Sequence, residues 1–343
     1  MKVEIFSCIG IFSYICSFRM STCWTITNGT AGTTSQALGL AQSVGFKKIE
    51  QKVFKAKFTL SLIPSLAHVF LKKFLANDSG TLEGPWPDVI IGCGRRTIPF
   101  LLYIKRASSG RTYCIYIQDP KISPKYFDLV IKMDHDSIEG ENVLSTAFSL
   151  NLINRTKLLE ETKKFRGAFA KLPKPYYTIL IGGDTKRYKM NDKAINDLLD
   201  KVGAIVEFCP GSVLVTTSRR TPDSLREGLA SKFKENTKFY MANSDCTEKN
   251  PYFAILELAE KIFVTNDSVN MISEACACRK LVCIIPLLNI SLGRSKKFLE
   301  GIIAKGWAFP FNCKNLKKQK KIALSNNEMI AAKVREKLLE HKK

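Results

Sequence analysis

Short loops that combine glycine with hydroxyl side chains follow apolar runs of this sequence, and such loops are suited to binding phosphate. The first reads Asn28-Gly-Thr-Ala-Gly-Thr-Thr-Ser-Gln36 and leads into a predicted helix over Ser35–Val44. A helix N-terminus offers unpaired N–H groups and a positive dipole to an anion. We therefore expect a ligand at Gly29, Gly32, Thr33 and Ser35. An ordinary N-capped helix start is the alternative. The loop has no G-x-G-x-x-G fingerprint and no G-K-[ST] end, which argues against a dinucleotide dehydrogenase and a P-loop ATPase.

Pairs of cationic residues mark three further loops. Arg95 and Arg96 follow Gly92-Cys-Gly94 at the start of a predicted helix, where a cation opposes the helix dipole. An anionic ligand held by bidentate arginine contacts would explain this placement. Two loops of the second half have the same character, and we interpret their residues as ligand-binding: Gly182, Gly183, Lys186 and Arg187 in one, Ser218, Arg219 and Arg220 in the other.

The segment Thr265–Ala275 begins a predicted helix with an acidic and a hydroxyl residue. We expect Asp267, Ser268 and the helix N-terminus to lie at a diphosphate, because anions bind at helix N-termini. Glu274 stands about two turns into this helix and would accept a hydrogen bond from a ribose hydroxyl. A solvated helix carboxylate is the alternative for Glu274.

Two aspartates follow predicted strands of the first half and are candidate catalytic bases. Asp119 belongs to Gln118-Asp-Pro120, and Asp136 belongs to Asp134-His-Asp136. Either carboxylate could take a proton from an acceptor hydroxyl. An Asp-Pro turn is the alternative for Asp119, and a capping or turn role is the more common one for His135.

The cysteines predict neither a metal centre nor a disulfide framework. The chain has 11 cysteines and no C-x-x-C pair, and the C-x-C of Cys276 and Cys278 has no second ligand pair near it. Several cysteines lie inside apolar runs, as small core residues do. Free thiols imply a reducing compartment, so we expect a cytoplasmic protein without a bound metal.

Apolar runs that we predict to be strands, among them Thr22–Thr27 and Leu281–Ile285, alternate with helical segments along the chain. This alternation indicates parallel sheets covered on both faces. At 343 residues, the chain exceeds the size at which single cores stop growing. We predict an α/β protein of two Rossmann-like domains whose parallel sheets face each other across a cleft. The first domain spans 20–171, and the second, nucleotide-binding domain spans 172–312, after a stiff Leu172-Pro-Lys-Pro175 hinge.

The two ends of the chain differ from these domains. Ile5–Phe18 is apolar but shorter than the ~20 residues that a membrane span needs. Because Glu4 interrupts the charged start and no small-residue cleavage site follows, we expect 1–19 to be an extension or a weakly membrane-touching segment outside the fold. A chain starting at Met20 should then be soluble and equally stable. Residues 313–343 form a basic tail, in which Glu328–His341 is expected to be a helix that packs on the first domain.

The charge balance favours anionic partners. The chain has 53 Lys and Arg against 31 Asp and Glu, a net charge of +22. Such a field attracts phosphorylated small molecules, anionic membrane surfaces or nucleic acid. No nucleic-acid module or aromatic platform is present, so nucleic acid ranks last. A solubilising surface is the alternative explanation, and a peripheral contact with the inner face of a membrane stays open.

The same loops, taken together, resemble the mitochondrial fission "elongated mitochondria" family from about Ser21 to Asn312. The matching motifs are Asn28–Gln36, Pro87–Arg96, Ile117–Pro120, His135-Asp136, Ile181–Asp184, Thr216–Thr221, Asn250-Pro-Tyr252 and Thr265–Ala275. The resemblance implies a GT-B-like fold. Plant members of the family recruit a dynamin-related protein to the mitochondrial surface. Its many bacterial members are often labelled nucleoside-diphosphate-sugar epimerases.

This sequence departs from the family pattern in two places. The first loop usually reads Asp-Gly-Lys-Ala-Gly, whereas Asn28 and Thr30 stand here in place of the carboxylate and the lysine. The usual Gly-Lys-Pro after the Glu274 helix is Arg279-Lys280-Leu281. An epimerase also fits badly, since the chain has no suitably placed Tyr-x-x-x-Lys pair and no dinucleotide fingerprint.

Two functions follow from these residues. The first is the binding of a nucleoside diphosphate or nucleotide sugar, with transfer of the glycosyl group to an envelope or lipid-linked acceptor if the protein is an enzyme. Helix N-termini and arginines would then stabilise the leaving diphosphate without a metal. The alternative is a non-catalytic scaffold that recruits a protein partner at a membrane surface.

Overall fold

The computed structural model describes residues 22–54, 82–242, 250–293, 295–311 and 326–341. The predicted extension 1–19 and the first part of the basic tail lie outside these residues. The described chain divides into two compact units. The first unit lies within Met1–Leu152 and Ser325–Lys343, and the second unit lies within Ile153–Leu324.

The first unit is built on a six-stranded sheet with the order β2-β1-β3-β4-β5-β6, in which every pairing is parallel. Its strands are β1 (Thr22–Thr27), β2 (Lys48–Val53), β3 (Val89–Cys93), β4 (Tyr113–Ile117), β5 (Leu129–Met133) and β6 (Val143–Thr146). Its helices are α2 (Ala31–Val44), α4 (Ile98–Ala107) and α11 (Asn326–His341), with short 3-10 helices at Arg95–Thr97 and Pro124–Tyr126.

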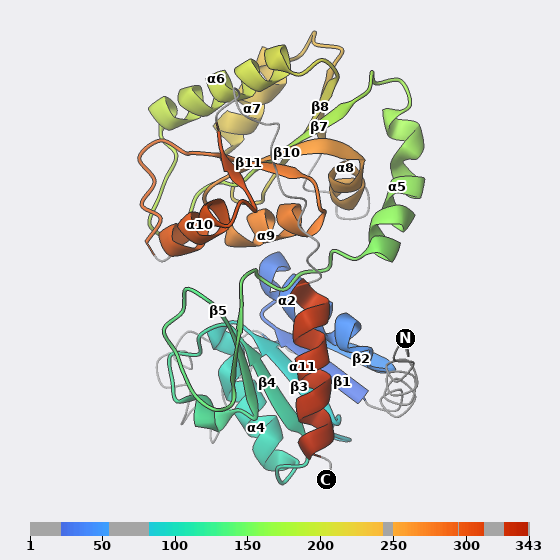
Figure 1. The fold of residues 1–343 in the computed structure, drawn as a ribbon, viewed down its shortest axis with the longest axis vertical. Helices are drawn as coiled ribbons and strands as arrows, with labels where there is room; N and C mark the ends of the chain where they lie inside the picture. Colours follow the sequence, from blue (N-terminus) through green and yellow to red (C-terminus); the bar gives the residue numbers. More distant parts are fainter. Residues whose placement is uncertain (1–21, 55–81, 243–249, 294, 312–325, 342–343) are drawn as a thin grey trace, which may run out of the picture. The chain divides into compact units, whose positions relative to one another are not determined.

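Helices cover both faces of this sheet, which explains the unbroken apolar strands. All five residues of β3 and of β4 are buried, and alternate residues enter two different cores. One core joins the sheet to α2 and α11, and the other joins it to α4. Figure 1 shows α11 beside α2. The Arg335 guanidinium fixes this pair of helices by donating to the Ser43 carbonyl at 2.8 Å, so the tail helix is found on the first unit, where the sequence placed it.

The second unit has a six-stranded parallel sheet with the order β12-β11-β10-β7-β8-β9. Its strands are β7 (Tyr176–Ile181), β8 (Ser212–Thr217), β9 (Phe239–Ala242), β10 (Ala259–Thr265), β11 (Leu281–Ile285) and β12 (Phe309–Pro310). Its helices are α5 (Arg155–Phe169), α6 (Asp192–Phe208), α7 (Asp223–Lys232), α8 (Tyr252–Leu258), α9 (Val269–Ala277) and α10 (Ser295–Ala304). Read from β9, the strands follow the Rossmann order 3-2-1-4-5-6.

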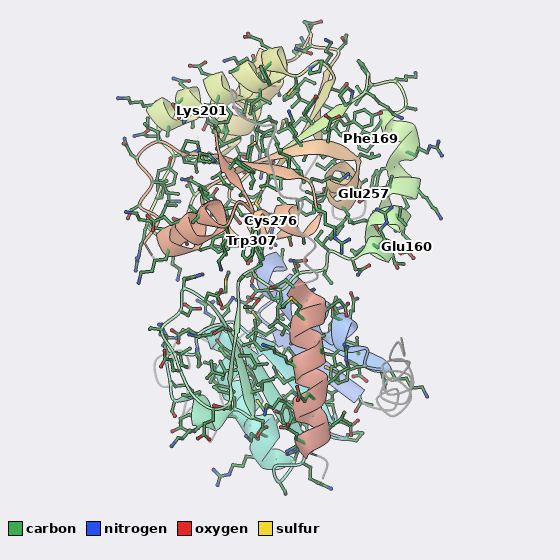
Figure 2. All side chains as sticks on the ribbon, viewed as in Figure 1. Glu160, Phe169, Lys201, Glu257, Cys276 and Trp307 are labelled. Carbon is green, nitrogen blue, oxygen red and sulfur yellow. The ribbon has the colours of Figure 1, made fainter. Side chains whose placement is uncertain are left out.

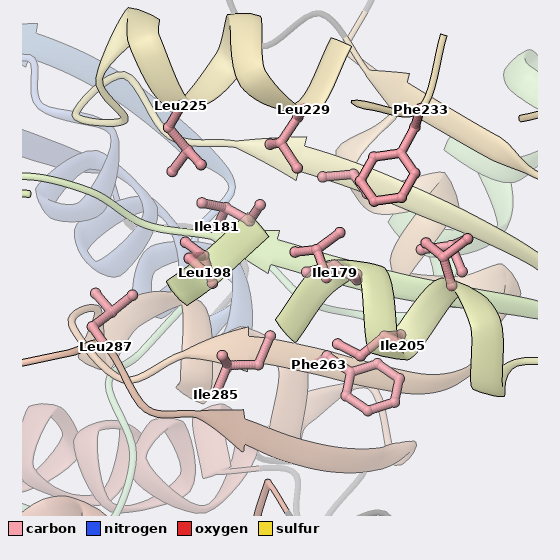
Figure 3. Packing of buried hydrophobic residues seen from close by; sticks show 14 of the residues in the cluster. Ile179, Ile181, Leu198, Ile205, Leu225, Leu229, Phe233, Phe263, Ile285 and Leu287 are labelled. Atoms are coloured by element: carbon pink, nitrogen blue, oxygen red, sulfur yellow. The ribbon is translucent and has the colours of Figure 1, made fainter. Parts of the chain in front are cut away.

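Apolar side chains of α6 and α7 form the core on one face of this sheet. Leu198 and Ile205 of α6 and Leu229 of α7 pack over Ile179 and Phe263 of the strands (Figure 3). A smaller core joins α5 and α8 to the other face. Every residue of β7 and β8 is buried, as expected for parallel strands with helices on both sides.

The structure differs from several sequence-based boundaries. Helix α2 begins at Ala31 instead of Ser35, and Arg95 and Arg96 lie in a 3-10 turn before α4 instead of at the start of that helix. The strands β2, β6 and β12 and the helix α10 were not predicted. The units divide after Leu152, N-terminal to the boundary expected at 171, because α5 packs against α8, where Arg155 forms an ion pair with Glu257 (labelled in Figure 2).

The seven described cysteines are free and buried. Cys276 lies beside Trp307 in Figure 2, and its thiol contacts the Trp307 carbonyl at 3.6 Å. Burial raises the pKa of the Cys276 thiol to about 12, so the thiolate that reacts with other groups is scarce. These cysteines therefore act as small core residues. Within the described chain, no helix has the length and apolar character that crossing a membrane would require.

Candidate functional site

Each sheet has one point where the strand order reverses, and ligands of open α/β sheets bind at the carboxyl ends of the strands there. In the first unit this switch point lies between β1 and β3, and in the second unit between β7 and β10. The loops after these four strands contain most of the residues that the sequence singled out.

The loop after β1 is held together by its own side chains. The Asn28 side-chain oxygen accepts hydrogen bonds from Thr30 N at 3.2 Å and from the hydroxyls of Thr30 and Thr33, each at 2.9 Å. Gly29 has a left-handed φ of 79°, a conformation that glycine adopts without strain. Gly29 is exposed, and Gly32, Thr33 and Ser35 are partly exposed at the start of α2. The four predicted residues therefore share one loop and one helix N-terminus.

The loop after β3 adjoins this helix start. Gly94 has a φ of 94°, and a Cβ atom at that position would lie 3.3 Å from the Thr33 methyl carbon. Arg95 and Arg96 follow in the 3-10 turn and are exposed. Neither guanidinium has a hydrogen bond or ion pair to another residue in the part of the chain that the structure describes. The first switch point thus brings the N-terminus of α2 and two arginines together.

The two candidate bases lie in turns at the same edge of the first sheet. The Asp119 carboxylate accepts from Lys121 N at 2.9 Å and forms an ion pair with the Lys121 ammonium, and only 7% of its side chain is exposed. In this structure the Asp119 carboxylate thus stabilises a turn, which was the alternative to a catalytic base. Asp136 is partly exposed, and its backbone carbonyl accepts from Lys132 Nζ at 2.8 Å.

In the second unit, an ion pair between a buried carboxylate and an exposed arginine joins the loops after β10 and β8. The Asp267 side chain is 0% exposed, and its Oδ2 accepts from the Arg220 guanidinium at 2.8 Å and from Gly183 N at 3.1 Å. Its Oδ1 accepts from the Thr265 hydroxyl at 2.7 Å. Arg220 also donates to the carbonyls of Gly183 and Asp184, at 3.2 and 2.7 Å. Asp267 and Arg220, both predicted to bind ligand, here bind each other.

The two glycines after β7 are required by this close packing. A Cβ atom at Gly182 would lie 2.0 Å from Asp267 Oδ1, and one at Gly183 would lie 2.1 Å from the Arg220 carbonyl oxygen. Gly182 N donates to the Thr265 hydroxyl at 2.8 Å. Both glycines are buried, so packing alone accounts for them.

Three cations on the loops after β7 and β8 take no part in the Asp267–Arg220 ion pair. Lys186, Arg187 and Arg219 are exposed, and their side chains form no hydrogen bond or ion pair with the rest of the described unit. The nearby Asp184 carboxylate accepts hydrogen bonds from Lys189 Nζ at 2.8 Å and from Met190 N at 3.0 Å. Burial opposes ionisation of Asp184, but these two bonds outweigh it and hold its pKa below the usual value.

Helix α9 begins at the second switch point. Ser268 caps it, accepting from Met271 N at 3.4 Å, and remains partly exposed together with Val269 and Asn270. Further along the helix, the Glu274 carboxylate accepts a 2.5 Å hydrogen bond from the Tyr252 hydroxyl. Burial, reinforced by Glu274, raises the pKa of Tyr252 well above its usual range. Sequence reasoning did not select Tyr252 as a site residue, although the Asn250-Pro-Tyr252 motif was the signal for it.

No three His, Cys, Asp or Glu side chains of the described residues gather closely enough to hold a metal ion. The groups that the described residues offer at the two switch points are helix N-termini, hydroxyls, cations and single carboxylates.

Comparison with protein families and curated proteins gives consistent matches. A family model described as "Mitochondrial fission ELM1" matches residues 31–338. The mitochondrial fission protein ELM1 of Arabidopsis thaliana is 29% identical over 228 residues, which cover 60% of this chain and 53% of that protein. The matched stretch thus spans about half the length of the plant relative. The uncharacterized protein RP120 of Rickettsia prowazekii is 28% identical over 330 residues, covering 84% of this chain and 90% of RP120.

Solved structures share the fold at low sequence identity. The UDP-GlcNAc 2-epimerase of Methanocaldococcus jannaschii has a TM-score of 0.54 and 14% identity, covering 92% of this chain and 99% of that one. The UDP-GlcNAc 2-epimerase of Neisseria meningitidis, bound to UDP-GlcNAc, has a TM-score of 0.50 and 12% identity, covering 93% and 100%. UGT89C1 of Arabidopsis thaliana, complexed with UDP, has a TM-score of 0.50 and 10% identity, covering 94% and 93%. These likenesses confirm the predicted fold class of two Rossmann-like domains of the GT-B type.

Proposed function

Because the chain belongs to the mitochondrial fission ELM1 family and has a GT-B fold, we propose that its second unit binds a nucleoside diphosphate or nucleotide sugar. The observation that carries this proposal is the N-terminus of α9, which begins at the switch point of a sheet with Rossmann strand order. Nucleotides bind at such points because helix N–H groups are directed at their phosphates.

The bound diphosphate would contact Ser268 and the N–H groups at the start of α9. Arg219, Lys186 and Arg187 are exposed cations on neighbouring loops and would add charge-assisted hydrogen bonds. Asp267 would not repel the phosphates, since its buried carboxylate is paired with the Arg220 guanidinium. Glu274 would accept from a ribose hydroxyl. Two of the similar structures contain UDP-GlcNAc and UDP, which supports this class of ligand.

If the protein is an enzyme, the reaction is transfer of the glycosyl group to a hydroxyl of an envelope or lipid-linked acceptor. The acceptor oxygen bonds to the anomeric carbon, the bond from that carbon to the diphosphate breaks, and the acceptor proton passes to Asp119 or Asp136. Asp119 must leave its ion pair with Lys121 to do this. Arg95 and Arg96, beside Gly29, Gly32, Thr33 and Ser35 at the start of α2, would hold a phosphate of the acceptor.

The direct test is isothermal titration calorimetry of the full chain with UDP, ADP, GDP, CDP and UDP-GlcNAc. Glu274→Gln keeps the side-chain shape but removes the charged acceptor, and this should cost about 1.5–3 kcal/mol of binding free energy. The control is Lys234→Ala, which removes an exposed cation beyond the C-terminal end of α7 and should leave the affinity unchanged. No binding of any of these ligands at millimolar concentration would refute the proposal.

The second candidate is a scaffold that recruits a protein partner at a membrane surface. It is favoured by the net charge of +22, since anionic membranes attract basic proteins. Co-flotation with vesicles containing phosphatidylserine or phosphatidylglycerol, together with the absence of nucleotide binding, would favour the scaffold.

A further inference from the structure

The Tyr252 hydroxyl makes one of the shortest hydrogen bonds in the described part of the second unit. It donates to Glu274 Oε2 at 2.5 Å, a distance typical of a hydroxyl bound to an ionised carboxylate. We propose that Tyr252 is a positioning residue, which fixes the Glu274 carboxylate in the orientation that receives the ribose. This role rests on the nucleotide site proposed above.

The surroundings of Tyr252 make its hydroxyl a rigid reference point. Tyr252 N donates to the Asn250 side chain at 3.1 Å, and Ile255 N donates to the Pro251 carbonyl at 2.9 Å, which fixes the first turn of α8. The Ile255 carbonyl in turn accepts from the Thr178 hydroxyl of β7 at 2.7 Å. Ala254, Ile255 and Leu256 are buried, so the helix that carries Tyr252 is anchored to the sheet.

Glu274, in contrast, is only partly buried on α9. Ordering a glutamate side chain only when the ligand binds costs affinity. The Tyr252 hydroxyl lowers this cost because it holds one carboxylate oxygen before the ligand arrives. It also keeps the group an acceptor, since a hydroxyl donated to an oxygen favours the ionised carboxylate. Both effects improve the recognition of a ribose hydroxyl.

The experiment compares ribose with deoxyribose in matched tyrosine variants. The probe is the tightest-binding of UDP, ADP, GDP and CDP, together with its 2′-deoxy and 3′-deoxy forms, measured by calorimetry. Tyr252→Phe keeps the ring and deletes the hydroxyl. The control is Tyr176→Phe, because the Tyr176 hydroxyl also bonds inside the second unit, to the Phe169 carbonyl at 3.0 Å, but stands at the start of β7, at the opposite edge of the sheet.

We expect the wild type to prefer the ribonucleotide over one deoxy form by about tenfold or more. Tyr252→Phe should bind the ribonucleotide roughly 3- to 10-fold more weakly and lose most of this preference, while Tyr176→Phe keeps both. In the Glu274→Gln background, Tyr252→Phe should add little, because a residue that acts through Glu274 has no further effect once the charged acceptor is gone.

The outcomes separate the positioning role of Tyr252 from the existence of the nucleotide site. If the wild type binds a nucleotide but Tyr252→Phe retains the full ribose preference, or if the two substitutions are additive, the positioning role is wrong and the nucleotide site stands. Without any nucleotide binding by the wild type, both are wrong. Thermal unfolding of Tyr252→Phe and Tyr176→Phe in the absence of ligand shows whether a loss of affinity reflects a loss of fold.

Discussion

The switch points of the two sheets are built from similar residues but are stabilised differently. After β1 and β3, neutral groups hold the loop through Asn28, and both arginines of the next loop are exposed without a partner among the described residues. After β7 and β10, a buried carboxylate and Arg220 hold the loops, and Arg219 alone of the pair has no such bond. Adjacent arginines are therefore not equivalent: one can stabilise the loop while its neighbour is available to an anion.

The largest expected effect separates Arg220 from Arg219. Arg220→Ala leaves Asp267 buried without its cation, and the free energy of unfolding should fall by about 1.5–3 kcal/mol. Arg219→Ala should change it by less than about 0.5 kcal/mol, as an exposed substitution does. Thermal and urea unfolding of both variants measure the difference. Equal stability of the two variants would show that the ion pair does not hold the loops together.

Arg219, whose substitution should hardly change stability, is expected to matter for ligand binding. Arg219→Ala should weaken binding of the tightest nucleoside diphosphate by roughly 1.5 kcal/mol at low salt, through a lost charge-assisted hydrogen bond. The loss should shrink as salt rises, because screening weakens the exposed contact. Calorimetry at two salt concentrations checks this. A loss that is independent of salt, or absent, would exclude Arg219 from the phosphate site.

In the first unit, the loop should depend on a side-chain acceptor at position 28. Asn28→Ala removes the oxygen that receives Thr30 N and two hydroxyls, and should lower stability by about 1 kcal/mol, as loss of a capping side chain does. Asn28→Asp, the residue usual in the family, keeps such an oxygen and should be close to wild type. Urea unfolding measures the stability of both variants. An Asn28→Ala variant as stable as the wild type would contradict the role of this side chain.

The smallest effect concerns Asp184 and the pH dependence of the second unit. Lys189 and Met190 N outweigh burial and lower the pKa of Asp184. A carboxylate whose folded pKa lies below its unfolded value of about 3.9 stabilises the fold above that pH, and the contribution is lost as the pH falls through the folded pKa.

Asp184→Asn should therefore reduce the Tm slightly at neutral pH, by an amount that shrinks below about pH 4. Glu235→Gln, at an exposed carboxylate of the same unit, serves as the control. A difference between wild type and Asp184→Asn that grows on acidification would have the wrong sign and would refute this account.

Much of the fold followed from local pattern. The strands Thr22–Thr27 and Leu281–Ile285 were predicted with their observed ends, because fully buried parallel strands are continuous apolar runs. Strand β2 was missed because its sequence, Lys-Ile-Glu-Gln-Lys-Val, belongs to an edge strand in which no residue is buried. The start of α2 was placed too late, since Ala31 and Gly32 carry no hydroxyl or acidic start signal.

For the candidate site, the sequence by itself determined which residue types stand in the loops, because strands end where apolar runs give way to glycine, hydroxyl and charged residues. It also indicated that those loops share one edge of each sheet, since parallel strands all end on the same side. What the tertiary structure alone decided is the use of each side chain. Arg220 meets an aspartate 47 residues away and Tyr252 meets a glutamate 22 residues away. Only folding brings such partners within hydrogen-bond distance, and no local pattern encodes that.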